Sequence, residues 1–261
     1  MDKTEFEAAY AAGVAQRQPF VIGVTPIALV PEGYMQLDLE RCLPEPARIR
    51  ETVGVSDVKS FVLYWKDYHT ATSKIFADES KSQIAAVLDY HGDIASWCTH
   101  RLVLTLNKSR EWLVWRGKHG TGLTQEQFAD FLEDNLADIT APDAASVLEA
   151  ASHLEANKTV KFKSGINLDS GAVQFTYDEA VEGKGRGTLK VPNRFTVGIP
   201  IMAGQDPTAI EVRLRYRISA DGVLSFIYKL DNPGRLLEQQ FEAITEYIGR
   251  ACDCEAYLGS I

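Results

Sequence analysis

The sequence predicts an α+β protein: a largely antiparallel β-sheet in the C-terminal half with helices packed on it, preceded by a helical and hairpin region and a proline-rich extended N-terminal arm. Three observations favour this fold class. Between residues 159 and 230, short alternating runs of apolar and polar residues are separated by Gly-rich turns, which is typical of antiparallel strands. Apolar residues at three- and four-residue spacing indicate helices on either side of that stretch. Five prolines between residues 19 and 46 argue against a helix there.

Length and composition are those of an ordinary globular protein. The chain has 261 residues, of which 45% are hydrophobic and 24% charged, close to the averages for folded domains. Its longest apolar stretches are too short and too often interrupted by Gly and Pro to cross a bilayer. The first residues include Asp2, Glu5 and Glu7, where a secretory signal would be basic. We therefore expect a cytoplasmic protein without a membrane partner.

Three regions follow from these patterns. Residues 1–52 are expected to form an N-terminal helix and an extended arm. Residues 53–156 are expected to form an α/β region with a hairpin and two helices, and residues 157–261 an antiparallel sheet followed by a C-terminal helix. The last two regions, residues 53–261, are also compatible with a single compact domain.

The N-terminal region combines a short helix with the arm. Apolar residues four apart predict the helix over residues 3–18, and short strands are expected near residues 27–30 and 34–37. An extended, proline-rich segment forms no core of its own, so its apolar side chains must pack on another surface. In a self-assembling protein, we expect that surface to belong to a neighbouring subunit.

The middle region starts with a helix that Ser56 is predicted to cap and whose apolar face includes Phe61 and Trp65. Residues 84–88 and 102–106 are predicted to be buried strands, either a hairpin or an adjacent pair.

Two helices are predicted to end the middle region. Thr124 and Gln127 match a capping box, and apolar spacing continues the first helix to Ile139, with Pro142 ending it. Asp143 is predicted to cap the second helix, over residues 143–156.

The C-terminal region is predicted to be a succession of strands and then a helix. An Asp-Gly pair at residues 221–222 between two alternating runs is the strongest hairpin signal in the chain. The last helix is predicted to begin after Asn232, with Pro233 at an early helical position. The strands are expected at residues 159–162, 173–177, 188–191, 195–201, 210–218 and 223–230.

Cysteine spacing gives a weak metal signal. Cys252 and Cys254 are the only close pair, and their spacing is shorter than the two-residue separation that metal sites favour. We interpret them as reduced thiols near a frayed end of the last helix. A zinc site shared with a histidine or a second subunit is the alternative.

One segment contains residues suited to metal-dependent hydrolysis. Asp89, His91 and Asp93 lie within five residues of each other, and His100 follows, so a base or a metal site is conceivable. Asp, His and Gly are also ordinary residues for a turn that leaves a strand. We favour the turn, in which the side chains diverge.

No other motif predicts an enzyme. The Gly-rich residues 182–187 contain Lys184 and Arg186, but they lie between two predicted strands and match neither a P-loop nor a dinucleotide fingerprint. We interpret them as a hairpin tip, with an anion-contacting or subunit-contacting loop as the alternative. Nucleophile-elbow, kinase and metalloprotease signatures are absent from the sequence. We expect a non-enzymatic protein without a cofactor or bound metal.

The most informative surface is a predicted strand over residues 211–218, in which arginines alternate with apolar residues. Arg213, Arg215 and Arg217 are expected on one face, about 7 Å apart. A solvated face, a subunit contact and a nucleic-acid contact all remain open for this row. The predicted basic face consists of Arg213, Arg215, Arg217, Lys161, Lys163, Lys184 and Arg186.

Charge is unevenly distributed along the chain. Residues 157–230 contain eleven Lys or Arg and seven Asp or Glu, a net charge of +4, whereas the whole chain carries −9. The remaining residues therefore carry −13. Surfaces of opposite charge on one molecule favour contact between copies.

Aromatic residues gather in the middle region at Trp112, Trp115, Phe128 and Phe131. Their spacing most often indicates a hydrophobic core. A base-stacking platform is the alternative, and it requires exposed rings beside Arg or Lys.

Two segments resemble a known family. Residues 112–118, with the sequence Trp-Leu-Val-Trp-Arg-Gly-Lys, and residues 123–135, followed by Pro142, resemble the YfdQ family. The most distinctive part is Phe-Ala-x-Phe-Leu-Glu-Asp-Asn. That family is a domain of unknown function encoded mainly by phages and prophages. The resemblance implies a virus-derived, cytoplasmic accessory protein, and it implies no catalytic residues.

Three functions follow as hypotheses. The leading one is a non-enzymatic phage protein that self-assembles into a ring or shell-like homo-oligomer. The second is a protein that binds nucleic acid or a nucleotide through the arginine row, in recombination or in countering host defence. The third and weakest is a metal-dependent hydrolase.

Overall fold

The computed structural model describes residues 20–22, 25–27, 44–46, 48–153, 163–166, 173–177, 187–218 and 224–261. Its contacts divide the chain into two units, Met1–Ile49 and Arg50–Ile261. The helix predicted over residues 3–18 and the strand predicted at residues 34–37 lie outside the described residues. Helices and antiparallel sheets in separate layers confirm the α+β fold class.

The first unit contains a short hairpin within the predicted arm. Strands β1 (Phe20–Ile22) and β2 (Thr25–Ile27) pair antiparallel, with Val21 opposite Pro26. Proline is tolerated here because a two-stranded ribbon has only edge strands. The strand predicted at residues 27–30 overlaps β2 by one residue, and its remainder is not described.

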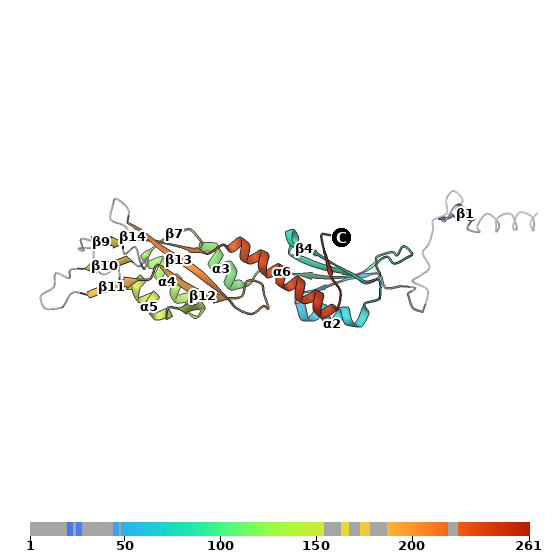
Figure 1. The fold of residues 1–261 in the computed structure, drawn as a ribbon, viewed down its shortest axis with the longest axis horizontal. Helices are drawn as coiled ribbons and strands as arrows, with labels where there is room; N and C mark the ends of the chain where they lie inside the picture. The colour runs from blue at the N-terminus through green and yellow to red at the C-terminus, as the bar shows by residue number, and fades with distance from the viewer. Residues whose placement is uncertain are drawn as a thin grey trace, which may run out of the picture. The chain divides into compact units, whose positions relative to one another are not determined.

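The second unit begins with a five-stranded sheet, called here the first sheet (Figure 1). Strand β5 pairs antiparallel with β4 and β6, which confirms the predicted adjacent pair. The edge strands β3 and β15 run parallel to β6 and β4. In spatial order the strands are β15 (Ala256–Leu258), β4 (Lys74–Asp78), β5 (Gln83–Val87), β6 (His100–Thr105) and β3 (Glu51–Val55).

Two helices pack on one face of the first sheet. They are α2 (Val58–Tyr68) and α6 (Pro233–Cys252), which lie against each other (Figure 1). Pro233 begins α6 as predicted. The predicted Ser56 cap of α2 is wrong: Asp57 is the cap, because its extended backbone lets a carboxylate oxygen accept the amide of Ser60 at 2.8 Å.

The second sheet is also five-stranded and is entirely antiparallel. Helices α3 (Arg110–Lys118), α4 (Gln125–Asp134) and α5 (Ala144–His153) belong to the same half of the fold (Figure 1). In spatial order the strands are β7 (Gly122–Thr124), β14 (Leu224–Leu230), β13 (Thr208–Ile218), β12 (Arg194–Ile199) and β8 (Ile139–Ala141). The pairing of Ile218 with Leu224 agrees with the predicted hairpin, whose turn is not described.

The aromatic residues of the middle region form the core beneath the second sheet. Trp112, Trp115 and Phe128 are at most 1% exposed, and the ring of Phe131 meets that of Trp115 edge to face at 5.0 Å. The hydroxyl of Tyr228 donates to the backbone oxygen of Trp115 at 2.7 Å. The core interpretation is therefore confirmed, because a base-stacking platform needs exposed rings.

The predicted boundary of the capping-box helix is partly wrong. Thr124 and Gln127 form the capping box, but α4 ends at Asp134, well before Pro142. The side-chain amide of Asn135 donates to the backbone oxygen of Phe131, and the chain then makes a 3-10 turn, η3 (Leu136–Asp138). Ile139 thus lies on β8, opposite Val197, although its spacing continues the helical pattern.

A third, three-stranded sheet contains β9 (Lys163–Ile166), β10 (Val173–Tyr177) and β11 (Gly187–Val191) in the order β11-β10-β9. The strands predicted at residues 173–177 and 188–191 match β10 and β11. The strand predicted at residues 159–162 lies outside the described residues. In the part of the chain that the structure describes, no helix combines the length and the apolar character needed to cross a membrane.

Candidate functional site

The predicted arginine row is present on the open face of the second sheet. Val212 and Leu214 of β13 are buried, whereas Arg213, Arg215 and Arg217 are exposed on the opposite face. Because Arg213 lies opposite both Arg194 of β12 and Lys229 of β14, these two cations extend the row sideways. We call this surface the basic face; it comprises Arg194, Arg213, Arg215, Arg217 and Lys229.

Two of the five cations are already paired. Arg194 forms an ion pair with Glu211, and Arg213 forms one with Asp231 at 2.8 Å. Among the described residues, no carboxylate pairs with Arg215, Arg217 or Lys229. Since the paired side chains are themselves about half exposed, these ion pairs are weak surface pairs. The face therefore retains three cations for a partner.

The other predicted members of the basic face are not brought onto it by the described structure. Lys163 begins β9 in the third sheet, opposite Thr176, and its side chain is not described. Lys161, Lys184 and Arg186 lie outside the described residues. The placement of those four residues therefore stays a prediction, whereas the described structure adds Arg194 and Lys229, which the alternation of one strand does not reveal.

A histidine at the end of α3 lies next to the basic face. The Nδ1 atom of His119 accepts the backbone N–H of Leu230 at 3.0 Å. Burial lowers the pKa of His119 below its ordinary value, and the charges of Arg116 and Lys229 lower it further. His119 therefore adds little positive charge at neutral pH.

The candidate metal and hydrolase residues do not converge. The carboxylate of Asp89 accepts the backbone N–H groups of Thr99 and His100, both at 2.9 Å. Burial alone would raise the pKa of Asp89, but these hydrogen bonds outweigh it and lower the pKa below its ordinary value. Asp89 thus orders the start of β6, as the turn interpretation requires.

The histidines of that segment contact other groups. Nε2 of His91 lies 3.6 Å from Sγ of Cys98, whereas Nε2 of His100 lies 2.9 Å from the hydroxyl of Tyr64. Asp93 is exposed. Across the described residues, no three His, Cys, Asp or Glu side chains are grouped so as to hold a metal ion.

The C-terminal cysteines lie in an ordered part of the fold. Helix α6 continues through Cys252, which is 7% exposed, and β15 follows, so the frayed helix end is wrong. Cys252 and Cys254 are free thiols, and Cys42 is not described. Burial raises the pKa of Cys252 to about 12, and the neighbouring Cys254 contributes. Such a thiol is protonated and unreactive at neutral pH.

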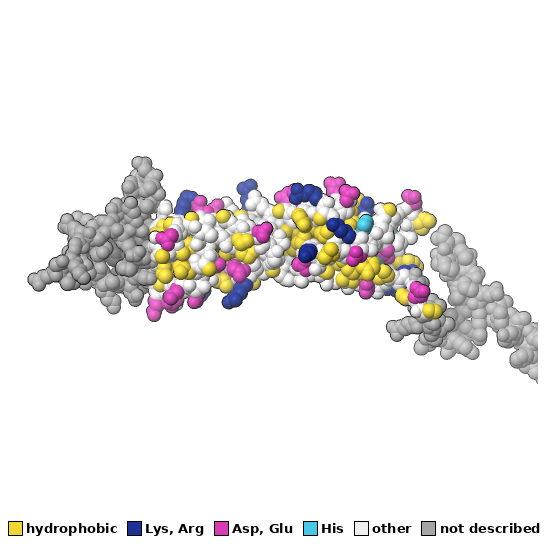
Figure 2. Space-filling view, turned by 90° about the horizontal axis from the view of Figure 1, so that it is seen from below, with side chains coloured by type: hydrophobic (Ala, Val, Ile, Leu, Met, Phe, Trp, Pro, Cys, Tyr) yellow, Lys and Arg dark blue, Asp and Glu magenta, His cyan; other side chains and the backbone are white. Residues whose placement is uncertain are grey.

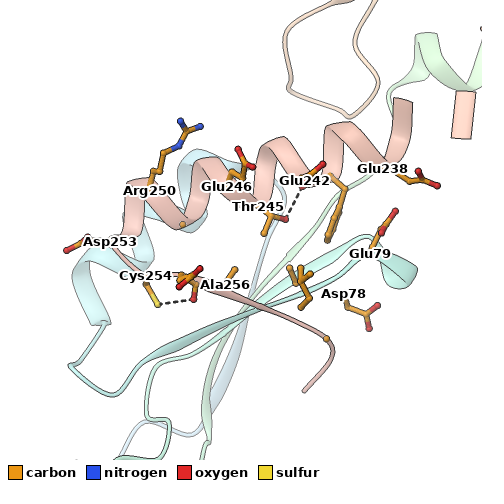
Figure 3. Close-up of a pocket in the computed structure, with 16 residues that line it drawn as sticks. Asp78, Glu79, Glu238, Glu242, Thr245, Glu246, Arg250, Asp253, Cys254 and Ala256 are labelled. Carbon is orange, nitrogen blue, oxygen red and sulfur yellow. Dashed lines mark hydrogen bonds between the residues drawn. The ribbon is translucent and has the colours of Figure 1, made fainter. Parts of the chain in front are cut away.

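An acidic groove that the sequence analysis missed lies between α6 and the edge of the first sheet (Figure 3). Its volume is about 1100 Å³. Glu238, Glu242 and Glu246 follow one another along α6, and Asp78 and Glu79 lie across the opening from them (Figure 3). With Asp253 and Glu255, seven carboxylates and one cation, Arg250, line the groove among the described residues, and Asp78 is also ion-paired with Lys81 at 3.1 Å. The sequence feature that could have revealed this acidic helix face is the four-residue spacing of the three glutamates.

Charged side chains of both signs occur over much of the fold. Figure 2 shows one side of the molecule, where acidic and basic side chains lie close to one another around hydrophobic patches. Two groups with mostly one sign of charge are the basic face on the second sheet and the acidic groove beside the first sheet. The basic face lies within the segment that carries +4, and the acidic groove is lined by residues of the remainder of the chain.

Comparison with known proteins identifies a family. No curated protein and no solved structure matches the chain. The family described as "Uncharacterized conserved protein (DUF2303)" matches residues 2–261, nearly the entire sequence. The chain therefore belongs to the DUF2303 family.

Proposed function

We propose that this protein is a non-enzymatic, phage- or prophage-encoded accessory protein that self-assembles into a ring or shell-like homo-oligomer in the host cytoplasm. One observation carries the proposal: the basic face presents Arg215, Arg217 and Lys229 without carboxylate partners among the described residues, on a chain whose net charge is −9. A second copy of the chain is an abundant acidic partner for such a face.

Charge arithmetic favours a protein partner over nucleic acid. Binding to nucleic acid through charge strengthens with the number of phosphates that Lys and Arg neutralise, and strongly salt-dependent binders make about 6–10 such contacts. The basic face has three cations that are not already paired with Glu211 or Asp231. The acidic remainder of the chain would also repel a polyanion.

The non-enzymatic part of the proposal rests on the candidate catalytic residues. Asp89 is occupied by two backbone amides, and His91 and His100 contact Cys98 and Tyr64 respectively. These side chains therefore serve local structure. The phage origin rests on the resemblance of residues 112–118 and 123–135 to the YfdQ family.

Native mass measurement at low and high salt tests the proposal. We expect particles larger than 28.9 kDa at micromolar concentration in 50 mM salt, which dissociate in 500 mM salt because the contact is electrostatic. The variant Arg215→Gln/Arg217→Gln should be shifted towards the monomer. The matched control Lys59→Gln/Lys66→Gln removes two exposed charges from α2 and should assemble like wild type. A monodisperse 28.9 kDa particle under all conditions would contradict the proposal.

Nucleic acid is the second candidate, favoured by the regular spacing of the arginines at about 7 Å along β13. If the three free cations each neutralise one phosphate, affinity for an oligonucleotide should fall with salt at a log–log slope of about −2 to −3. The Arg215→Gln/Arg217→Gln variant should then lose most of that slope. Absence of binding at 50 mM salt would eliminate this candidate and leave self-assembly unaffected.

A further inference from the structure

We infer that the acidic groove between α6 and β15 is the surface that receives the basic face of a neighbouring copy. This inference rests on the proposed self-assembly and names the contact through which it occurs. The groove and the basic face are opposite in charge and lie on different parts of one chain. A second copy therefore supplies each with a complementary partner.

The groove is lined by apolar as well as charged side chains. Phe241 and Ala77 belong to the lining and are at most 5% exposed. Leu258 of β15 also lines the groove and is 85% exposed, an unfavourable position for a leucine in the isolated chain. Covering Leu258 would contribute apolar burial to a contact that charge alone holds weakly.

The helical wall of the groove has an unusual charge pattern. Glu238, Glu242 and Glu246 stand four residues apart, so their side chains are neighbours on α6. Like charges at this spacing destabilise a helix. No cation is paired with any of the three among the described residues. A cationic partner would turn this repulsion into attraction.

The spacing of the charges on the two surfaces is similar. Successive glutamates on α6 are about 6 Å apart along the helix axis, since four residues rise 1.5 Å each. Successive arginines on β13 are about 7 Å apart, since two residues rise about 3.4 Å each. Three carboxylates thus span a length similar to that of Arg213, Arg215 and Arg217, and flexible Arg side chains accommodate the difference. Arg213 takes part by exchanging its weak, half-exposed ion pair with Asp231 for one with the partner.

The basic face also has an apolar side chain beside its arginines. Ile227 of β14 lies directly opposite Arg215 and points to the same, open side of the sheet. Ile227 is only partly buried. In the proposed contact Ile227 covers Leu258, while the arginines of the neighbouring strand β13 reach the glutamates. Charge and apolar contact therefore favour the same arrangement.

A contact between two different surfaces has a consequence for symmetry. Each copy retains a free groove and a free basic face after one contact forms, so assembly continues until a ring closes or a chain extends. A variant that lacks one of the two surfaces stops growth. Two such variants, each lacking a different surface, should complement each other as a single pair.

The test uses two variants of the full-length chain. The groove variant is Glu238→Gln/Glu242→Gln/Glu246→Gln, which relieves repulsion within α6 and so should not impair folding. The face variant is Arg215→Gln/Arg217→Gln. Each alone should be monomeric by native mass spectrometry, and their equimolar mixture should give a heterodimer near twice the chain mass and nothing larger. The matched control Glu126→Gln/Asp130→Asn/Glu133→Gln neutralises three exposed carboxylates of α4 and should assemble like wild type.

The outcomes separate this inference from the proposed function. If wild type assembles and the face variant does not, but the groove variant assembles fully, the groove assignment is wrong and self-assembly stands. A mixture that stays monomeric, although each variant is folded by circular dichroism, also overturns the assignment. If wild type itself is monomeric at 50 mM salt, the proposed function fails first.

Discussion

The indole Nε1 of Trp65 donates a hydrogen bond to the backbone oxygen of Cys252 at 3.1 Å, although 187 residues separate the two positions. Trp65 is 2% exposed and Cys252 is 7% exposed. The bond ties the middle of α2 to the last turn of α6 and so fixes the helix that forms one wall of the acidic groove. Residues far apart in the sequence thereby depend on each other for stability.

Replacement of Trp65 by Phe should lower the free energy of unfolding by about 1–3 kcal/mol, because the buried oxygen of Cys252 loses its indole donor. Urea denaturation followed by circular dichroism would show a lower midpoint with an unchanged slope. Trp97→Phe, at a side chain that is 73% exposed, is the control and should leave the midpoint nearly unchanged. Equal midpoints for Trp65→Phe and wild type would show that the hydrogen bond contributes nothing.

Replacement of Thr124 by Ala should remove half of the capping box of α4, since the Thr124 hydroxyl accepts the backbone N–H of Gln127 at 3.2 Å. The expected loss of unfolding free energy is about 0.5–2 kcal/mol. Thr121→Ala, in the exposed turn just before β7, is the comparison and should cost less. The idea fails if the two variants unfold at the same urea concentration.

The stability of the fold should depend on pH through His119. Burial and the nearby Arg116 and Lys229 lower the pKa of His119 in the folded state below the ordinary value of 6.5. The unfolded chain therefore binds the proton more readily, so His119 contributes a loss of stability as the pH falls through about 6.5. Above that pH, His119 is neutral in both the folded and the unfolded chain, so it causes no loss of stability.

Comparison with His119→Asn isolates this contribution, because the other histidines titrate in both proteins. Asn supplies an oxygen that can accept the backbone N–H of Leu230 in place of Nδ1. When the pH is lowered from 7.5 to 5.5, wild type should lose more unfolding free energy than His119→Asn. A difference that is constant over this range would refute the assignment.

Removal of residues 1–31 should leave a folded protein with a smaller assembly. The core residues that the structure describes all lie in Arg50–Ile261, so circular dichroism and the denaturation midpoint should change little. The deleted segment carries the apolar residues Phe20, Val21, Ile22, Ile27, Leu29 and Val30, which we expect to pack on a neighbouring copy.

Deletion of residues 1–18 alone is the matched comparison, because it keeps all six of those apolar residues. This shorter deletion should retain the native mass of the wild-type assembly. Two results for the longer deletion would argue against the arm's role: an unchanged native mass, or loss of the helical signal, which would place the arm in the core of its own subunit.

The long, regular elements could be predicted from the sequence because their periodicity is strong. The alternation of apolar and polar residues in β13 and β14 predicted both strands, and it predicted that Arg213, Arg215 and Arg217 share one exposed face. Pro233 and the apolar stripe of α6 gave the final helix. In each of these elements, apolar residues recur often enough along the sequence to identify the face that is buried.

Short elements and the groove were not predictable in the same way. Strands β3 and β15 contain five and three residues, and they are strands because of parallel neighbours that lie elsewhere in the sequence. Ile139 continued a helical pattern but lies on β8, because tertiary pairing overrides local spacing. The groove joins Asp78 and Glu79 to residues of α6 and β15, so only the folded chain brings its two walls together.

The position of β15 has a consequence for synthesis of the chain. This strand completes the edge of the first sheet beside β4, and α6 covers its face, yet both are translated after the rest of that sheet. A nascent chain that has emerged only as far as β6 therefore exposes Ile75, Ile84 and Leu102 to solvent, and such exposed apolar side chains favour aggregation. Premature termination before Pro233 should accordingly yield insoluble fragments, whereas loss of the amino-terminal arm should not.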